Sequence, residues 1–380
     1  MVAPVRYKAL SMMPQRSVLN TFPSVTNNFQ ITKSDDFLPY RAGDYTFTQT
    51  NGTAAPFIWN GGAVQLSTAG STAADLAVLA LPSSSWQIVP GNQLWCDTKL
   101  AIRSTSTDTN MYCGLFDAVN PTLATNGIYF IKPAGGTTVN FVIKKAGTTT
   151  TFQNVADLSR PSGLTSVQDP NASVGVLTAT QSGGIYNSIV VTTPGAGYQS
   201  APIVVATGAT GTTATLYCQI GSTAYGVQSF AQASLPSSTG IPYGSLVAPY
   251  ITAGGTGYTT ATVEVAALIN LQFYFDGKGR IIVGVNGRQV MAIGGSAVET
   301  GPYNITPGST YNLSSAGVGP DFSTTGTQLT TALAPFQPPI GSFYNIAPQG
   351  ALLYDVGFFN TTANARSMVV DEYNLGTELN

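Results

Sequence analysis

The chain has 380 residues, of which 43% are hydrophobic and only 8% are charged, and its formal net charge is −2. Ordinary soluble domains carry roughly 25% charged residues, so hydroxyl, amide and glycine groups must cover this surface, as suits a protein held in an assembly. A net charge near zero creates no strong field to attract nucleic acid, and the complete absence of histidine removes the commonest general base and metal ligand.

Residues 1–40 are predicted to form an extended arm, because they contain four prolines and no amphipathic period. The arm has too few apolar side chains to fold alone and too many for a purely solvated tail. We expect it to become ordered against a partner, either a neighbouring copy or another protein of an assembly, with phosphate binding as the less favoured alternative. Its candidate docking residues are Arg6, Lys8, Arg16, Phe22 and Phe29.

Residues 41–165 are predicted to form the first part of a β-sandwich. Residues 94–103 alternate apolar and polar side chains, and residues 139–144 do so again, which is the period of half-buried strands. The longest helix-compatible stretch, residues 72–81, ends at Pro82 and is also apolar enough for a strand.

Residues 166–266 differ in composition from the rest of the chain and are predicted to be an inserted module. They hold two charged residues, Asp169 and Glu264, and an internal repeat. In each copy a Tyr-x-Ser-aliphatic strand leads into a Gly-x-Gly-Tyr turn, at residues 195–198 and 255–258. Glycine permits the positive φ that such turns require. Two copies indicate a small β module whose units bury their faces against each other.

Residues 267–380 are predicted to complete the sandwich. Residues 271–290 predict a three-stranded meander, because Asn286-Gly287 between two apolar runs is the strongest short hairpin signal. The fold expected is therefore an all-β sandwich, interrupted by the inserted module and preceded by the arm.

No constellation for catalysis, cofactor binding or metal binding is found. A Ser-His-Asp or Cys-His arrangement needs histidine, and the adjacent pairs Asp35-Asp36 and Asp371-Glu372 would point to opposite faces of a strand. Cys96 and Cys113 are expected on neighbouring strands as reduced, buried groups. Candidates for stacking on sugar rings are Trp59, Trp86 and Trp95, although tryptophans of a β-sandwich more often lie in the core.

The sandwich segments resemble the concanavalin/laminin-G jelly-roll family over roughly 240 residues. The residues that carry the resemblance are Phe57–Asn60, Pro90-Gly91, Gly114–Asp117, Asn126–Phe130, the Asn286-Gly287 hairpin and Leu353–Phe359. Calcium-binding members use a cluster of Asp and Asn, and only Asp117 and Asn126 match it here. The Gly-x-Gly-Tyr repeats are similar to glycine-rich β repeats of phage structural proteins, so the whole chain resembles phage capsid decoration (cement) proteins.

The resemblance implies a non-enzymatic virion protein that binds and stabilises a capsid surface. Its partners would be the major capsid protein or another virion protein, and further copies of itself in a homo-oligomer. No specific nucleic acid or membrane partner is expected, since no signal peptide or 18-residue apolar run occurs. Assembly would take place in the host cytoplasm. The alternatives are a tail-associated, receptor-binding module that recognises a host surface glycan, and a degenerate glycosidase.

Overall fold

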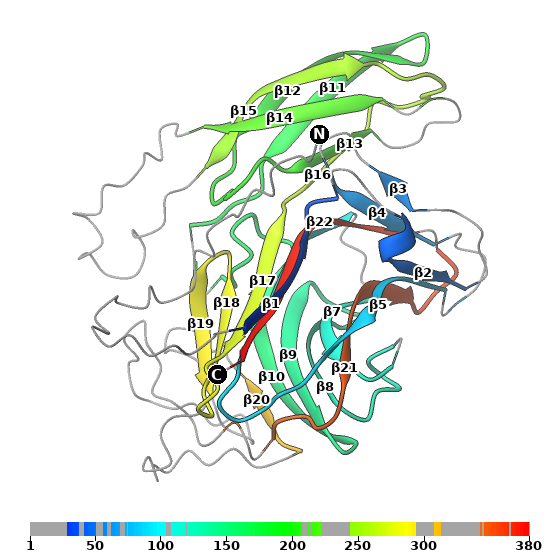
Figure 1. Ribbon diagram of the computed structural model, residues 1–380. Helices are drawn as coiled ribbons and strands as arrows, with labels where there is room; N and C mark the ends of the chain where they lie inside the picture. The colour runs from blue at the N-terminus through cyan, green and yellow to red at the C-terminus, as the bar shows by residue number, and fades with distance from the viewer. Residues whose placement is uncertain are drawn as a thin grey trace.

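The computed structural model consists of two large β-sheets packed face to face, with a smaller β module beside them (Figure 1). It describes residues 29–293 and 308–379 with internal gaps, the longest being 222–243 and 313–342. The only helical element in this part is a 3-10 turn, Ala42–Asp44. No described helix is long and apolar enough to cross a membrane.

The first sheet, sheet A, has the strand order β19-β18-β17-β6-β22-β4-β3, with β1 also paired to β22. Its strands are β1 (Phe29–Asp35), β3 (Phe57–Ile58), β4 (Val64–Ser67), β6 (Gln93–Arg103), β17 (Ile269–Phe275), β18 (Ile281–Val285), β19 (Arg288–Ile293) and β22 (Ser367–Leu379).

The second sheet, sheet B, has the strand order β2-β5-β21-β7-β8-β9-β10-β20. Its strands are β2 (Thr46–Gln49), β5 (Leu76–Trp86), β7 (Thr109–Phe116), β8 (Gly127–Lys132), β9 (Thr138–Lys145), β10 (Thr148–Asp157), β20 (Thr310–Asn312) and β21 (Leu352–Asn360).

Strands from both ends of the chain interleave in both sheets. In sheet A, β6 lies between β17 and β22, and in sheet B, β21 lies between β5 and β7. Neither sheet is complete without the C-terminal strands, so the two halves build one sandwich. The prediction of an all-β jelly-roll sandwich interrupted by a module is confirmed.

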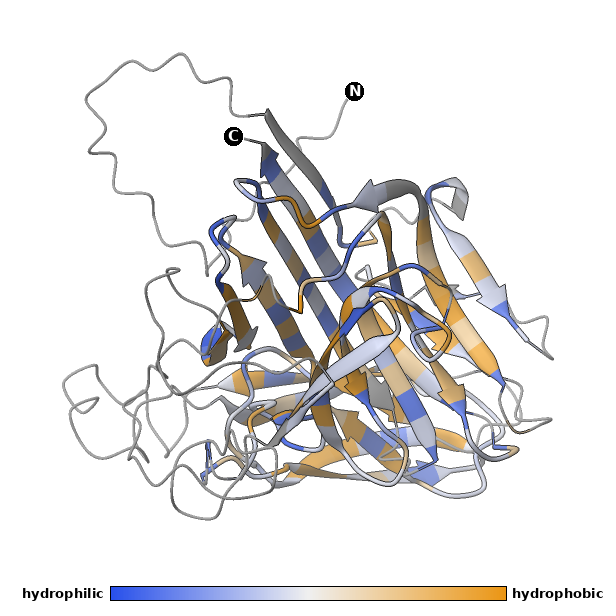
Figure 2. Cartoon of the chain, turned by 90° about the horizontal axis from the view of Figure 1, so that it is seen from below, coloured by the Kyte–Doolittle hydropathy of each residue, from blue (hydrophilic) through white to orange (hydrophobic). Residues whose placement is uncertain are grey.

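The main core fills the space between the two sheets. Along several strands hydrophobic and hydrophilic residues alternate in bands, as Figure 2 shows. Leu94, Cys96 and Leu100 of β6 face the core, as the alternation predicts. Buried hydroxyl pairs lie within it, such as Thr98 and Tyr354, which form a 2.8 Å hydrogen bond between the two sheets. The stretch that was compatible with helix or strand is strand β5, and Pro82 lies where its register with β21 shifts.

The predicted placement of two cysteines on neighbouring strands is wrong. Cys96 lies on β6 of sheet A and Cys113 on β7 of sheet B, and both point into the shared core. Both thiols are free, as expected, and burial raises their pKa, so they stay protonated. The error arose because successive strands of a jelly roll can belong to opposite sheets.

The predicted meander is confirmed. Strands β17, β18 and β19 pair in antiparallel fashion, and Leu271, Phe273 and Phe275 face the core. Asn286 and Gly287 have φ values of 50° and 78°. Positive φ at both central residues is the requirement of a type I′ turn.

Replacing both turn residues, Asn286→Val and Gly287→Val, should destabilise the protein by roughly 1–2 kcal/mol per position, because β-branched residues resist positive φ. Urea unfolding followed by tryptophan fluorescence would measure the loss. A midpoint equal to that of the wild type would contradict the role of this turn.

The prediction that the arm is ordered by a partner is wrong in part. Its last segment, β1, pairs with β22 of the same chain from Phe29–Leu379 to Asp35–Tyr373. Residues 29–35 are thus ordered by the free edge of their own C-terminal strand, because an unpaired strand edge offers backbone donors and acceptors. Arg6, Lys8, Arg16 and Phe22 lie outside the described residues.

Candidate interaction surface

The inserted module contains two copies, or units, of a three-strand repeat in chain order. The first has β11 (Val176–Ser182), β12 (Ile185–Thr193) and β13 (Ile203–Ala206), and the second has β14 (Thr215–Gly221), β15 (Ser245–Ala253) and β16 (Val263–Ala266). The strands pair across the copies into a two-stranded sheet, β11-β12, and a four-stranded sheet, β15-β14-β13-β16. The pairing of β11 with β12 and that of β14 with β15 have equivalent registers with two shifts each; the first shift falls at the same position, and the second lies one step earlier in β14. The repeat seen in the sequence is therefore a structural repeat.

Each Gly-x-Gly-Tyr turn closes its unit in the same way. The tyrosine hydroxyl accepts a hydrogen bond from the backbone just before the unit's first strand: Gly175 N donates to Tyr198 at 3.0 Å, and Ala214 N to Tyr258 at 2.6 Å. The first glycines of the two turns, Gly195 and Gly255, have φ values of 64° and 62°. Glycine is needed there because an L side chain rarely adopts this conformation.

The two units wrap around one shared core. Strand β12 lies beside β15, held at its ends by backbone bonds from Tyr186 N to Gly254 O and from Leu246 N to Pro194 O, and β16 lies beside β11. The core between them is separate from that of the sandwich and includes the edge-to-face pair Tyr186 and Tyr258. The limits of the module at residues 166 and 266 stay a prediction.

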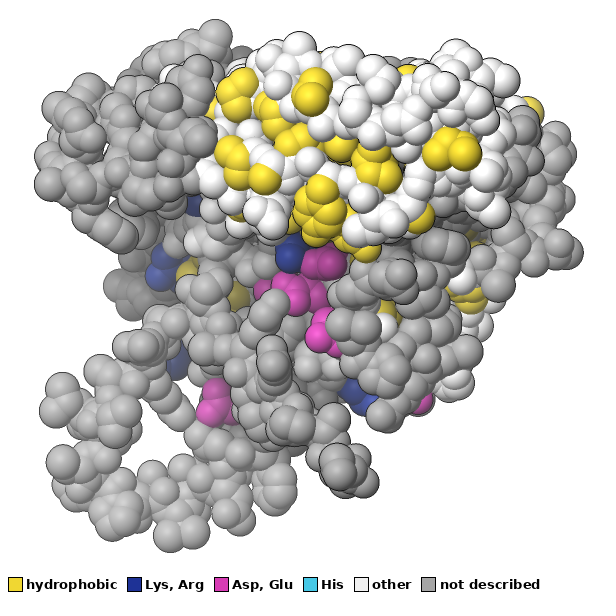
Figure 3. All heavy atoms as spheres, turned by 90° about the horizontal axis from the view of Figure 1, so that it is seen from above, with side chains coloured by type: hydrophobic (Ala, Val, Ile, Leu, Met, Phe, Trp, Pro, Cys, Tyr) yellow, Lys and Arg dark blue, Asp and Glu magenta, His cyan; other side chains and the backbone are white. Residues whose placement is uncertain are grey.

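The outer face of the module is apolar to an unusual degree. Seven large hydrophobic residues are exposed in the described part of the chain, and five of them belong to this module. We call their surface the module face; the five residues are Val174, Val176, Ile185, Val190 and Tyr250. Figure 3 looks down on it and shows apolar side chains spread among uncharged ones. A monomer seldom leaves such side chains gathered in one region without a use for them.

Val190 and Tyr250 occupy equivalent positions in the two units and lie at the middle of the module face. The two backbone bonds between β12 and β15 give these strands an antiparallel register that places Val190 opposite Tyr250. The Tyr250 ring stacks on that of Tyr217 from β14, with centroids 5.2 Å apart. Hydroxyls fill the space around them in mutual hydrogen bonds, such as that between Thr180 and Ser188 at 2.7 Å.

The module face carries no charge. Of the two acids in residues 166–266, Asp169 is buried and Glu264 is half-buried on β16. The neighbouring cation, Arg160, donates to the backbone carbonyls of Asp169 and Ala172. It therefore anchors the base of the module rather than its face.

A second unusual feature is the carboxyl group of Asp355 on the outer face of sheet B. The residue is 1% exposed, and neither carboxylate oxygen has a hydrogen-bond partner. Its neighbours across the sheet are Gly114 and Ala80, and Tyr112 lies close enough for the carboxylate to affect its titration. Burial raises the pKa of Asp355 to about 7. An acid with this pKa could exchange a proton at neutral pH, but glycoside hydrolysis ordinarily needs a second carboxyl beside it.

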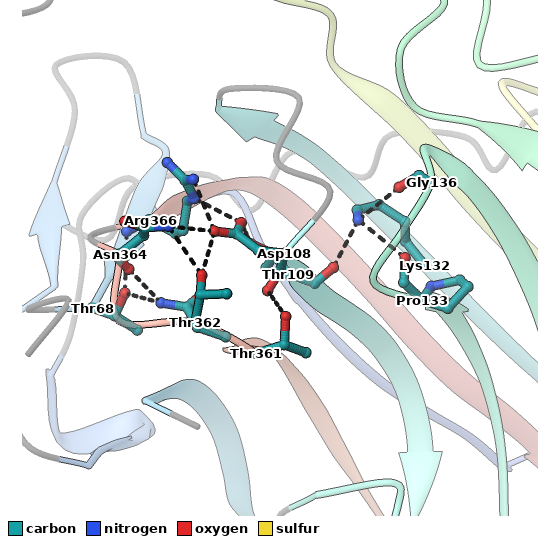
Figure 4. Close-up of polar contacts among 11 residues, drawn as sticks. Thr68, Asp108, Thr109, Lys132, Pro133, Gly136, Thr361, Thr362, Asn364 and Arg366 are labelled. Carbon is teal, nitrogen blue, oxygen red and sulfur yellow. Dashed lines mark hydrogen bonds and ion pairs between the residues drawn. The ribbon is translucent and has the colours of Figure 1, made fainter. Parts of the chain in front are cut away.

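A third polar group joins loops of the sandwich. In Figure 4, Arg366, Thr362 and Asn364 converge on Asp108, with the guanidinium donating to both carboxylate oxygens at 2.9 Å. The nearby Lys132 ammonium donates to three backbone carbonyl groups at 2.7 to 3.2 Å. These bonds tie the loop before β7 to the loop before β22, which is a structural role.

Two of the three aromatic candidates for sugar stacking are buried. Trp86 is 3% exposed in the main core. Trp95 is 2% exposed and lies against Gly376, where an added Cβ would meet its ring. Trp59 lies outside the described residues, and Phe29 is known only by its backbone position on β1. These two buried indoles present no ring face to solvent. Within the described part of the chain, a stacked aromatic pair that does reach the surface is formed by the half-buried Tyr217 and the exposed Tyr250.

The acidic residues considered as candidate site residues from the sequence have local partners. Asp117 does meet Asn126, and it accepts hydrogen bonds from the backbone of Thr125 and Asn126 in one loop. Asp35 accepts from the Tyr45 hydroxyl, and Asp371 forms a 2.7 Å ion pair with Lys99. Among the described residues, no group of three or more Cys, Asp or Glu side chains could hold a metal ion.

No protein-family model matches the chain, and no curated protein is similar to it in sequence. Solved structures overlap it only loosely. An endo-1,3-beta-glucanase from Streptomyces sioyaensis is 9% identical with a TM-score of 0.37, covering 93% of this chain and 97% of its own. A seed lectin of Lotus tetragonolobus is 8% identical with a TM-score of 0.33, covering 92% and 100%. A native glycosidic hydrolase is 6% identical with a TM-score of 0.36, covering 92% and 95%.

One pattern in the sequence could have predicted the module face. In residues 174–193 apolar side chains occur at both parities of the strand pattern, for example Val176 beside Leu177 and Val190 beside Ile189. One set must fill the small core, so the other set is left outside or covered by a partner.

Proposed function

We propose that the chain is a non-enzymatic structural protein of a phage particle that binds and stabilises the capsid surface. The observation that carries the proposal is the module face, an uncharged surface with exposed Val and Tyr side chains. Such a surface suits repeated protein–protein contacts, in which apolar burial contributes about 25 cal/mol per Å². The low charge content of the whole chain, 8%, supports the same role.

The arm supplies a second means of attachment in this proposal. Residues 1–28 precede β1 in the sequence, and in this proposal their basic residues Arg6, Lys8 and Arg16 meet an acidic or carbonyl-rich surface of the lattice. Attachment through the arm leaves the module face available for a different contact.

The alternative function is recognition of a host surface glycan by a tail-associated module. The observation that favours it is the stacked pair of Tyr217 and Tyr250, because aromatic rings on a hydroxyl-rich surface can pack against the apolar faces of sugars.

Co-sedimentation with particles stripped of this protein tests the proposal. The intact chain should bind, and a variant lacking residues 1–28 should stay folded, since β1 is retained, but bind at least tenfold more weakly. Full-strength binding by the truncated chain would remove the arm from the mechanism. Binding to host cells but not to particles, lost in Tyr250→Ala, would favour the glycan alternative instead.

A further inference from the structure

We propose that the module face is a contact between two copies of this chain, which meet face to face about a two-fold axis. The inference rests on the proposed function in taking the module face as an assembly surface, and it names the partner there. Its evidence is the charge, symmetry and size of that surface.

Because the module face carries no charge, it favours an uncharged partner. A charged surface that docked here would lose hydration without gaining a salt bridge, because the face offers no opposite charge. The same face of a second copy avoids this cost completely. Its threonine and serine hydroxyls can act as both donors and acceptors, so they can pair with identical groups across the contact.

The internal symmetry of the module suits pairing with itself. Antiparallel strands β12 and β15 are equivalent elements of the two units, so an approximate two-fold axis passes between them, beside Val190 and Tyr250. This internal axis runs perpendicular to the face, whereas the two-fold axis of a face-to-face dimer lies in the plane of the contact. If the two axes cross, residues near the crossing point meet their own or their equivalent counterparts in the other copy. The 55% exposed Val190 and the 44% exposed Tyr250 would form the centre of such a contact.

The size of the face predicts weak association. Four strands spaced about 4.8 Å apart, each with about seven residues at about 3.3 Å per residue, give a surface of roughly 19 by 23 Å. The resulting ~450 Å² per copy is about half of what a standard stable interface uses. We therefore expect a dissociation constant between about 10 µM and 1 mM, which becomes effective when many copies are held close together on one particle.

Sedimentation equilibrium of the purified full chain, from about 5 µM to 1 mM, tests the inference. The wild type should show a monomer–dimer equilibrium in this range. Val190→Lys should weaken dimerisation at least tenfold, because it places two like charges near the axis. The matched control is Leu123→Lys, which changes a 73% exposed apolar residue outside the module and should dimerise like the wild type.

Charge complementation gives a second readout that a folding defect cannot imitate. Val190→Lys and Val190→Asp should each be monomeric alone, and their mixture should dimerise again. Circular dichroism melts of both variants should match the wild type, since the position is exposed.

A wild type that stays monomeric at 1 mM, or equal losses in Val190→Lys and Leu123→Lys, would overturn the inference. Binding to stripped particles distinguishes the proposed function from the proposed dimer. A monomeric protein that still binds stripped particles leaves the proposed function intact, and a dimeric protein that binds none leaves only the self-association.

Discussion

Gly114→Ala is expected to be among the most destabilising single substitutions in the sandwich, with a loss of roughly 3 kcal/mol or more. Gly114 lies in the middle of β7 with φ of 147°. A Cβ built there would lie 2.6 Å from the carbonyl oxygen of Ile128 and 2.6 Å from Cα of Tyr129. Both contacts are to the backbone of β8, which cannot rotate away as a side chain could.

The matched control is Gly135→Ala in the loop after β8. Gly135 also has a positive φ, 96°, but an added Cβ would meet nothing within 4 Å. This variant measures the conformational strain alone, about 1 kcal/mol. Urea unfolding of both variants would separate strain from overlap. Equal losses would mean that β7 and β8 can separate at this point at little cost.

Asp355→Asn is expected to stabilise the protein most above pH 7, and by a smaller margin of roughly 1.5 kcal/mol at pH 5. The folded-state pKa of Asp355 is raised to about 7, whereas an unfolded aspartate titrates near 3.9. Between these values the folded state holds the proton and the unfolded state does not, so stability falls as the pH rises through this window. The difference amounts to roughly 4 kcal/mol and is complete above about pH 7.

Equilibrium urea unfolding at pH 5, 6, 7 and 8 would measure this effect. The free energy of unfolding of the wild type should fall more steeply with pH than that of Asp355→Asn, because asparagine has the shape of aspartate but no ionisable proton. Part of the decline should persist in the variant, because burial also raises the pKa of Asp97 to about 6. Parallel curves for the two proteins would show that Asp355 gains solvent or a partner in solution.

The sequence by itself determined the local structure. The alternation in β6, the Asn286-Gly287 turn and the Gly-x-Gly-Tyr repeats all predicted elements that the structure contains. Each signal depends on residues within about 20 positions of one another, where side-chain period and turn conformation are decided by the backbone itself.

Placement of the strands was decided only by the tertiary structure. Cys96 and Cys113 lie 17 positions apart yet belong to different sheets, and β1 pairs with β22 at the other end of the chain. No local pattern specifies such partners, because any free strand edge offers the same row of donors and acceptors.

The burial of Asp355 and the exposure of the module face were also decided only by the tertiary structure. The run Leu353–Phe359 is apolar on both faces apart from Asp355, so the burial of its carboxyl depends on strands and segments brought together from elsewhere in the chain. In the module, Leu177 is buried and its neighbour Val176 is exposed. Both are equally hydrophobic, and only the wrapping of six strands around one small core decides which of them stays in water.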